Sequence, residues 1–518
     1  MRNQKREADI STEVELKLSV RAADLPALKR ELTAMTPVSA QERLISTYYD
    51  TPDSALKRRG LTLRVREQGG QFTQTVKAGD SGGDIPSRGE WEDAVAENRP
   101  DPMAAQSGPR LPQDRGGEVQ PVFVTEIMRT SFQIEPGPEA AIEAAIDEGE
   151  IRAIDKDKRE SVGEIELELK RGDPALLYDL AFRLLEVAPI RIETRSKSER
   201  GYRLAEGGED APAAVHAEPV TLDPEMTVEA ALEKIGKNCI AQLLRNEPAV
   251  LSAQSEGVHQ MRVAVRRLRS AISSLKNRLP EQEVRRVTGE LRWLGGMLGP
   301  ARNLDVFAAE LLPAARIGLP NDAGWDELAD TLCRLRRAAY DEITKAILSD
   351  RYTPAILGLL RWFEASSWRR NGPSDEPGPM SPTIIEIVVS VLDRRRRNVR
   401  QRSNGFDRLA PPERHKLRIA VKKLRYTTEI FESLFDEVGL ENFVRRLKRL
   451  QSDLGYANDV RVAHEFVVEL FARIEPRSPS AHAWVALLEA HDQRVASGER
   501  KLRRHLRQMK DARPFWCE

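Results

Sequence analysis

The feature that most constrains the fold of this chain is a strand pattern in which charged and apolar side chains alternate. In the first such stretch, Glu13, Glu15 and Lys17 share one face of an extended strand, because successive side chains of a strand point to opposite faces. One such strand is typical of an ordinary half-exposed sheet. The alternation recurs, however, in residues 61–66, 72–77, 89–92 and 164–170.

This recurrence favours a closed sheet with its charges inside. Exposed ion pairs stabilise a fold by only about 0 to 1 kcal/mol each, so sorting acids and bases onto separate strands of an outer face would gain little. A closed barrel of about eight strands encloses side chains or one small ligand. We therefore predict an N-terminal antiparallel eight-stranded β-barrel tunnel with flanking helices. Glutamates on one wall and Arg/Lys on the other would suit a polyphosphate that carries a divalent metal.

The balance of charge along the chain differs between its two parts. The whole chain has 81 basic and 81 acidic residues. Residues 1–210 contain 31 bases and 40 acids, whereas residues 211–518 contain 50 bases and 41 acids. A neutral total thus conceals an acidic front and a basic rear, which indicates an anionic partner for the rear part.

Cysteine usage and hydropathy bear on the cellular compartment. Cys239, Cys333 and Cys517 are far apart and match no disulfide or metal-ligand framework, so we expect free buried thiols in a reducing cytoplasm. The sequence has no run of 18 apolar residues, and its basic N-terminus is not followed by an apolar run. We therefore expect a soluble cytoplasmic protein with no membrane partner.

The rear part contains an internal repeat. Helical spacing of apolar residues dominates after residue 224, and the segment from His259 to Arg269 returns 156 residues later, from His415 to Arg425. Further along, the second copy has lost two residues, so that residues 302–306 correspond to residues 457–460. Self-similarity of this length indicates a duplicated helical unit. The predicted organisation is a strand-rich domain at 10–205 with its last strand over 189–197, a linker at 206–221 and an all-α duplicated helical-bundle domain at 222–512, with repeats at about 222–370 and 382–512.

Each repeat carries a basic stripe along one helix. Like charges four residues apart destabilise an isolated helix by a few tenths of a kcal/mol, so two matched stripes without interleaved acids indicate a polyanion that both contact. A solvated helix face is the plainer alternative, and histidine metal ligation is another. Aromatic residues are only 5% of the chain, which argues against nucleic acid, since base stacking would be poorly served. The candidate polyphosphate-binding residues are His259, Arg262, Arg266, Arg267, Arg269, His415, Arg418, Lys422, Lys423 and Arg425.

Two family resemblances rest on these segments. The rear part resembles the CHAD domain through its paired His-x-x-Arg helices, which implies two pseudo-symmetric bundles with a basic groove for inorganic polyphosphate. The front part resembles the CYTH domain, which implies the triphosphate tunnel metalloenzyme fold. The CYTH motifs, in chain order, are Glu13-x-Glu15-x-Lys17, Tyr48-Tyr49-Asp50-Thr51, Arg64-x-Arg66, Thr75-Val76-Lys77, Ala145 to Gly149, Glu164-x-Glu166-x-Glu168 and Ser196 to Tyr202.

The CYTH resemblance assigns roles to the charged residues. It implies Mg²⁺ or Mn²⁺ held by Glu13, Glu15, Glu164, Glu166, Glu168 and Asp147. It implies phosphate binding by Lys17, Arg64, Arg66, Lys77, Arg129 and Lys197. The residues expected to be catalytic are Glu13, Glu15, Lys17, Arg64, Arg66 and Lys77. The plainer alternative for the two arginines is cross-strand pairing with Glu90 or Glu92.

The combined resemblance is to bacterial CYTH-CHAD inorganic triphosphatases. It implies metal-dependent, two-metal hydrolysis of inorganic triphosphate by the front domain and binding of long-chain polyphosphate by the rear domain. The chain has no Gly-x-x-x-x-Gly-Lys-Ser/Thr loop, so a P-loop enzyme is not expected. A class IV adenylate cyclase, a thiamine triphosphatase and a non-catalytic polyphosphate-binding scaffold stay open as alternatives. Association with polyphosphate granules is a further expectation.

Overall fold

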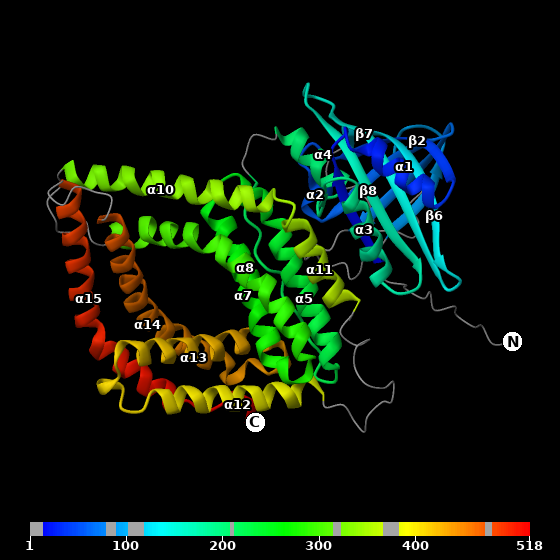
Figure 1. Cartoon of the computed structure of the whole chain (residues 1–518). Coiled ribbons are helices and arrows are strands. Elements are labelled where there is room, and N and C mark those ends of the chain that lie inside the picture. Colours follow the sequence, from blue (N-terminus) through cyan, green and yellow to red (C-terminus); the bar gives the residue numbers. More distant parts are fainter. Residues whose placement is uncertain are drawn as a thin grey trace. The chain divides into compact units, whose positions relative to one another are not determined.

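The computed structural model describes residues 14–78, 90–101, 119–207, 212–313, 323–365, 383–471 and 479–517. Glu13 therefore lies outside the described residues. So do most of the Pro/Gly-rich segment at 98–120 and nearly all of the proline-rich segment that separates the two predicted repeats. The chain divides into two compact units, residues 1–211 and 212–518 (Figure 1).

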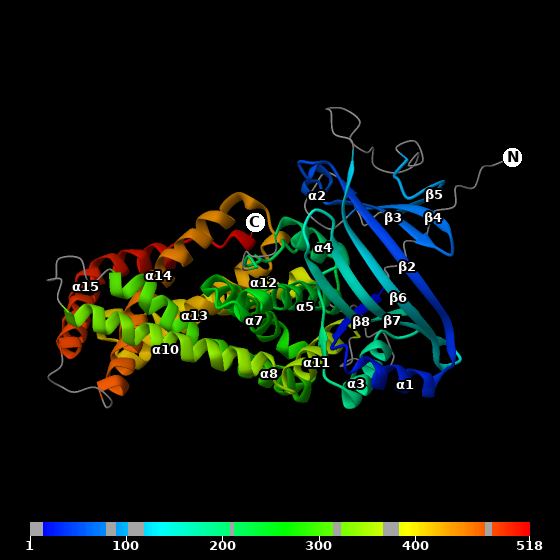
Figure 2. The same cartoon turned by 90° about the horizontal axis from the view of Figure 1, so that it is seen from above.

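One antiparallel sheet of nine strands forms the body of the first unit within the described residues. The strands follow the order β5-β4-β3-β2-β6-β7-β8-β1-β9 across the sheet. The long central strands β2, β6, β7 and β8 are seen side by side in Figure 2. The strand bounds are β1 (Val14–Val20), β2 (Val38–Asp50), β3 (Leu61–Gln68), β4 (Gln71–Ala78), β5 (Glu90–Val95), β6 (Gln120–Gly137), β7 (Ala140–Ala153), β8 (Arg159–Arg171) and β9 (Ile190–Ile192).

The sheet corrects two details of the predicted barrel. Across the described ranges it has nine strands rather than eight, and its end strands β5 and β9 are not paired with each other. The ninth strand arises because the chain returns along the free edge of β1, where Val20 pairs with Ile190. A strand predicted over 189–197 in fact ends at Ile192, and Lys197 begins a helix. The broader expectation of an α+β chain with an N-terminal antiparallel sheet is confirmed.

Two helices pack against the sheet and bury apolar side chains. Helix α1 (Leu25–Met35) buries its leucines at helical spacing and contacts β6, and helix α3 (Ala175–Val187) contacts α1 and β8. Leu16 and Leu18, the apolar half of the alternating first strand, are likewise buried. The charged side chains of the same strand therefore belong to the opposite face. The remaining helices of this unit are α2 (Ala55–Arg58) and α4 (Lys197–Glu206).

The second unit is entirely helical in its described residues. None of the helices that the structure describes is both long and apolar enough to cross a bilayer. The first repeat contains α5 (Val228–Arg245), α6 (Glu247–Leu251), α7 (Ser255–Leu275), η1 (Lys276–Arg278), α8 (Glu281–Val306), η2 (Phe307–Leu311), α10 (Ala323–Ile347) and α11 (Tyr352–Glu364). The second contains α12 (Ile384–Arg402), η4 (Phe406–Arg408), α13 (Pro411–Ile430), η5 (Glu432–Leu434), α14 (Glu437–Phe471), α15 (Pro479–Lys510) and η6 (Phe515–Cys517).

The sequence repeat corresponds to a repeat of structure. Helices α5, α7 and α8 begin 156 residues before α12, α13 and α14, and each set packs in the same order. The repeats meet where α7 contacts α13 and again where α10 contacts α15, so the helices follow one another round a closed frame (Figure 1). At the second meeting place Phe307 and Trp484 pack with ring centroids 5.2 Å apart.

The described part of the predicted linker lies along the helical unit. The backbone N–H of Val215 donates to Asn246 at 2.9 Å, and the Asn246 amide donates back to the Val215 carbonyl at 2.8 Å. Glu218 forms an ion pair with Arg245 at 2.7 Å. Residues 212–221 are therefore held to the helices by specific contacts.

Candidate functional site

The strand register gathers the charged side chains of four neighbouring strands. Lys17 of β1 stands opposite Glu166 of β8, and Glu164 of β8 stands opposite Asp147 of β7. On the next strand, β6, Arg129 stands opposite Asp147. Residues directly opposite each other in an antiparallel pair place their side chains on the same face, within contact distance. The alternation seen in the sequence thus becomes one charged face of the sheet.

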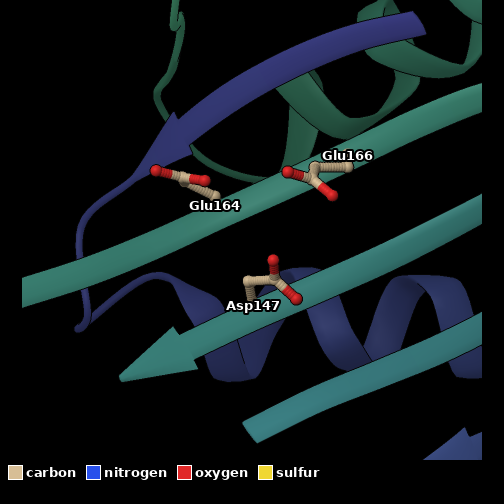
Figure 3. A group of neighbouring side chains, drawn as sticks. All are labelled: Asp147, Glu164 and Glu166. Atoms are coloured by element: carbon tan, nitrogen blue, oxygen red, sulfur yellow. The ribbon is translucent and has the colours of Figure 1, made fainter. Parts of the chain in front are cut away.

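Three carboxylates lie together on this face. Asp147, Glu164 and Glu166, called here the acidic group, each offer an oxygen within 4.8 Å of the other two (Figure 3). The side chains of Asp147 and Glu164 are only 1% and 2% exposed. Carboxylate oxygens are the donors that Mg²⁺ and Mn²⁺ prefer, so the donor set fits a hard divalent cation.

Two cations compensate the acidic group. The ammonium of Lys197 lies 2.9 Å from Asp147, 2.5 Å from Glu164 and 2.9 Å from Glu166. The guanidinium of Arg129 donates to Asp147 at 2.7 and 2.6 Å and to Glu166 at 2.5 Å. Removing one partner from such a partly buried network would leave the others uncompensated.

The charges in this network reinforce one another. Burial alone would raise the pKa of Glu166, but Lys197, Arg129 and Lys17 outweigh burial and lower that pKa to about 2. Burial alone would lower the pKa of Lys197, yet the three carboxylates raise it above its ordinary value. At neutral pH both Glu166 and Lys197 are therefore charged.

Helix α4 brings Lys197 to the acidic group. Ser196 caps the helix by accepting the N–H of Glu199 at 3.1 Å, while the Glu199 carboxylate accepts the Ser196 N–H at 2.7 Å. This capping box is visible in the sequence as Ser-x-x-Glu, and it explains why the predicted strand stops before Lys197. The same helix carries Arg200, a buried residue that ion-pairs with Glu164 and that the sequence analysis gave no role. The sequence signal for Arg200 was its position three residues after Lys197, which places both cations on the same face of a helix.

Close packing fixes the position of α4. A Cβ atom on Gly201 would lie 2.2 Å from the ring of Phe123, so only glycine allows the helix to approach strand β6. One residue later, the hydroxyl of Tyr202 donates to the fully buried carboxylate of Asp50 at 3.1 Å. Asp50 and Tyr202 both belong to segments that carry the CYTH resemblance, and here they anchor the helix that holds Lys197.

The arginines of β3 form a second, cationic part of the charged face. Arg64 reaches Glu90 at 3.7 Å and Glu92 at 4.0 Å, and its buried Nε has no hydrogen-bond partner among the described residues. Arg66 donates instead to the hydroxyl of Ser46 at 3.3 Å. Arg64 thus shows the alternative cross-strand pairing with Glu90 and Glu92, at long distances, whereas Arg66 binds Ser46 instead.

Arg66 also connects the two parts of the charged face. Burial lowers its pKa, and the nearby charges of Arg64 and Arg129 lower it further. Because Arg129 also binds the acidic group, the cationic strand and the acidic strands share one electrostatic environment. An anion would relieve this repulsion among the arginines.

Of the other predicted site residues, Lys17, Glu15 and Glu168 lie at the border of the acidic group, whereas β3, β2 and β6 separate Lys77 from it. Lys17 is 3.9 Å from Glu166 and 3.4 Å from Glu15. Glu168 pairs with Lys170 at 2.6 Å. On β4, Lys77 pairs with Glu90 at 2.8 Å.

In the helical unit the two basic stripes converge where α7 meets α13. Burial lowers the pKa of Lys422 to about 8, and Arg418 and Arg266 contribute to this shift. Arg266 of the first repeat stacks over the ring of Tyr426 of the second, 4.5 Å from its centroid. The buried Nε atoms of Arg266 and Arg418 make no hydrogen bond to any residue in the described ranges. Lys422, Arg266 and Arg418 are therefore largely buried cations whose charges are not fully compensated by nearby carboxylates.

Other residues of the two stripes are either bound by neighbouring side chains or exposed to solvent. Arg267 donates to Asn238 at 2.8 Å and to Gln242 at 3.3 Å, both on α5, and Lys423 is exposed. Arg425 pairs with Glu429 at 2.8 Å.

The histidines differ between the repeats. Burial lowers the pKa of His259, followed by the charge of Arg302, a cation that the sequence analysis had not assigned to the site. The exposed His415 lies 3.2 Å from Asn458 of α14. In the sequence, Arg302 could have been noticed as a cation that the first repeat has where the second repeat has Ala457.

Two family descriptions match the chain. The CYTH domain matches residues 11–202, and the CHAD domain matches residues 234–468. An inorganic triphosphatase of Haemophilus influenzae is 32% identical over 196 residues, which are 37% of this chain and 54% of that protein. The match thus spans about half the length of that relative.

Two further similarities extend over other parts of the chain. An uncharacterized protein of Mycobacterium tuberculosis is 25% identical over 492 residues, covering 88% of each chain. The crystal structure of the CHAD domain from the plant Ricinus communis is 26% identical, with a TM-score of 0.48, and covers 57% of this chain and 96% of that one. The two family matches show that the chain consists of a CYTH domain followed by a CHAD domain.

Proposed function

We propose that the N-terminal unit is a metal-dependent phosphohydrolase that acts on inorganic triphosphate, and that the helical unit binds long-chain inorganic polyphosphate. The observation that carries the proposal is the acidic group of Asp147, Glu164 and Glu166, which shares one face of a sheet with Arg64 and Arg66. A triphosphate needs both charges, because its metal requires hard oxygen ligands and its phosphates require cations.

The acidic group would hold Mg²⁺ or Mn²⁺. When bound, the metal would polarise phosphate oxygens and lower the pKa of a water. Lys197 forms ion pairs with all three carboxylates, and Arg129 forms ion pairs with Asp147 and Glu166. Glu15 and Glu168, at the border of the group, are further candidate ligands, and Glu13 is a proposed ligand that lies outside the described residues.

The cations of the charged face would receive the phosphates. Arg66 is desolvated and lies among other cations, so an anion is the partner that its environment lacks. Arg64 lies two residues away on the same strand, Lys77 lies on the neighbouring strand β4, and Lys17 lies beside the acidic group on β1. All three would stabilise charge on the transferring phosphoryl group. These residues need no rearrangement of the backbone to act, because they are fixed by strand pairing.

The relatives favour this substrate over the alternatives. The Haemophilus relative is an inorganic triphosphatase, and the CYTH match, residues 11–202, contains the acidic group. An adenylate cyclase or a thiamine triphosphatase would use the same face with a larger substrate. A scaffold without catalysis would have little use for a buried group of three carboxylates.

The helical unit offers a different kind of anion site. The α7 and α13 stripes meet, and Lys422 is held among Arg266 and Arg418 without a carboxylate at hydrogen-bond distance among the described residues. Burying uncompensated cations destabilises a free protein, so a polyanion that contacts both stripes would recover that energy. Such a unit would bring the enzyme to polyphosphate, in the cytoplasm or on granules.

One assay separates the candidate activities. The full chain is incubated with tripolyphosphate, ATP or thiamine triphosphate, with Mg²⁺ or Mn²⁺, and both phosphate and cyclic AMP are followed. We expect phosphate release that is fastest from tripolyphosphate and absent without metal. Cyclic AMP as the main product would establish the cyclase, and absence of turnover on all three would leave a binding protein.

A further inference from the structure

A cavity with several charged side chains in its lining opens within the second helical repeat. It has a volume of about 470 Å³ and lies between α13, α14 and α15. This is within the size range of pockets that hold small organic ligands. Its basic lining residues outnumber its acidic ones, Asp453 and Glu499, and are Arg414, His415, Arg418, Arg461, Arg494 and Lys501.

The first repeat provides an internal comparison. At the position of Arg414 the first repeat has Val258, which is fully buried, and at the position of Asp453 it has Met297. Charged groups have thus taken apolar positions in one copy of the duplicated unit. In the second copy these charges are paired locally, Arg414 with Glu499 and Asp453 with His505 at 2.6 Å, so the lining is charged where the first copy is apolar.

A second difference concerns one aspartate in each repeat. In the first, Asp305 is buried and bound by Arg336 at 2.6 Å and by the hydroxyl of Tyr340 at 2.8 Å, both from α10. In the second, the corresponding Asp459 reaches Arg418 only at 3.8 Å. In the second repeat this aspartate therefore lacks the two close partners that Asp305 has in the first.

Two buried polar atoms at the cavity lack hydrogen bonds. Among the described residues, the Nε donor of Arg418 and the Oε2 acceptor of Glu499 have no hydrogen-bond partner. The other oxygen of Glu499 binds Arg414, and Oε2 itself comes no closer to Arg503 than 3.9 Å. Unsatisfied buried groups of this kind call for a ligand or another partner.

The cavity also has an apolar wall. Leu454, Val495 and Leu502 line it together with the ring of Tyr456. A bare phosphate chain has only acceptor oxygens and no apolar surface, so it could neither donate to Glu499 nor cover this wall. A molecule that combines a phosphate with hydroxyl or amino donors and a flat apolar body would satisfy all three features.

We infer that this cavity is a binding site for a small organic phosphate of the nucleoside phosphate class. The phosphate would be bound by Arg418 and Arg494, a hydroxyl or amino group would donate to Glu499, and the base would lie against Tyr456. The site is independent of the charged face of the sheet and of the α7 stripe. Because His415 and Arg418 also belong to the α13 stripe, an occupant would weaken polyphosphate binding at that end.

Adenosine monophosphate is a suitable probe, because it lacks the triphosphate that the N-terminal unit is proposed to bind. Backbone hydrogen exchange of the full chain is measured without ligand and with adenosine monophosphate, inorganic phosphate or tripolyphosphate. We expect the nucleotide to slow exchange in residues 411–418, 452–461 and 494–502. Inorganic phosphate at the same concentration should leave these segments unchanged.

A pair of variants on one helix provides the control. Arg494 lines the cavity and Arg500 does not, and both are exposed on α15, so neither substitution should unfold the protein. Arg494→Gln should weaken nucleotide binding by about tenfold or more, the loss expected for one charge-assisted hydrogen bond, and Arg500→Gln should leave it unchanged. Absence of nucleotide protection, or equal nucleotide affinity in Arg494→Gln and Arg500→Gln, would overturn the inference.

Discussion

Arg129 donates two hydrogen bonds across the sheet to Asp147, one from Nε at 2.7 Å and one from a terminal nitrogen at 2.6 Å. The same guanidinium reaches Glu166 on the next strand but one. It is also close enough to Arg66 to lower the pKa of that residue. One side chain thus links the carboxylates of the proposed metal site to the cations of the proposed phosphate site.

Arg129→Lys tests this link. Lysine keeps the charge but cannot form a bidentate contact with Asp147 while also reaching Glu166. We expect tripolyphosphate turnover to fall by about 10- to 100-fold, as is typical when a group that orients metal ligands is changed. The measurement is the steady-state rate of phosphate release across a range of metal concentrations.

The control for this variant is Arg43→Lys. Arg43 forms an exposed pair with Glu126 on the same sheet, at 3.1 Å from its Nε. Exposed pairs contribute little, so this change should leave both turnover and thermal stability close to wild type. Equal losses in the two variants would mean that the effect of Arg129→Lys is not specific to the acidic group.

Gly201→Ala tests whether the packing of α4 positions Lys197. The added Cβ would lie 2.2 Å from the ring of Phe123, so the helix must shift. Overpacking of this kind costs about 1 to 3 kcal/mol, and we expect a lower unfolding temperature together with loss of turnover.

Gly289→Ala is the matched control on α8, where a Cβ would meet nothing within 4 Å. Because alanine favours helix more than glycine does, this change should leave stability unchanged or raise it by up to about 1 kcal/mol. Thermal unfolding of both variants, followed by circular dichroism, distinguishes the two results. If Gly201→Ala turned over tripolyphosphate at the wild-type rate, the packing of α4 against Phe123 would not be needed to position Lys197.

The sequence predicted the charged face well, because strand alternation is a local property with a fixed period. It placed Glu164, Glu166 and Asp147 on one face, and the 156-residue repeat anticipated the pairing of α7 with α13. The sequence-based prediction was wrong where contacts between distant parts of the chain determine the structure. Sheet closure depends on how the end strands meet, and the expectation of buried thiols was wrong for Cys333, which is exposed on α10.

The sequence also could not separate residues that share a stripe. Arg266 and Arg267 are adjacent and chemically identical, and only the packing of α5 shows that Arg267 donates to Asn238 and Gln242. Lys197 was predicted in the last strand, but the structure places it at the start of helix α4. The capping residues Ser196 and Glu199 were present in the sequence and begin a helix after the short strand that ends at Ile192.

The pH dependence of polyphosphate binding should report on Lys422. Its pKa is lowered to about 8 by burial and by Arg418 and Arg266, so the free protein loses this charge as the pH rises through that value. A polyanion binds the charged form, and affinity should therefore be highest below about pH 8 and fall above it. The measurement is polyphosphate affinity from pH 6.5 to 9.5 at constant ionic strength, a range of roughly 1.5 units on each side.

Lys422→Arg provides the comparison, because arginine stays charged over this whole range. The variant should bind with the same affinity at low pH and show a flatter profile above about pH 8. If both proteins lose affinity in parallel, Lys422 is not the group that titrates.

The salt dependence of binding should distinguish Arg266 from Arg267. Each cation that contacts a phosphate chain contributes to the slope of log affinity against log salt concentration, by analogy with single-stranded nucleic acid, where the contribution is about 0.7 per contact. Arg266→Gln should therefore weaken polyphosphate binding and reduce the slope by roughly that amount. Arg267→Gln should leave the slope unchanged, because Arg267 is engaged by α5. The opposite result would place the polyanion on the other side of α7.

The most direct test of the proposed function compares Glu166→Gln with Glu148→Gln in a tripolyphosphatase assay with Mg²⁺ or Mn²⁺. Glu166 belongs to the acidic group, whereas Glu148 is an exposed carboxylate next to Asp147 on the opposite side of strand β7. We predict that wild type and Glu148→Gln release phosphate at similar rates and that Glu166→Gln is at least about 100-fold slower, the loss expected when a charged group that acts on the transition state is neutralised. Equal rates for all three proteins, or no phosphate release by wild type with either metal, would contradict the assignment of this face as the catalytic site.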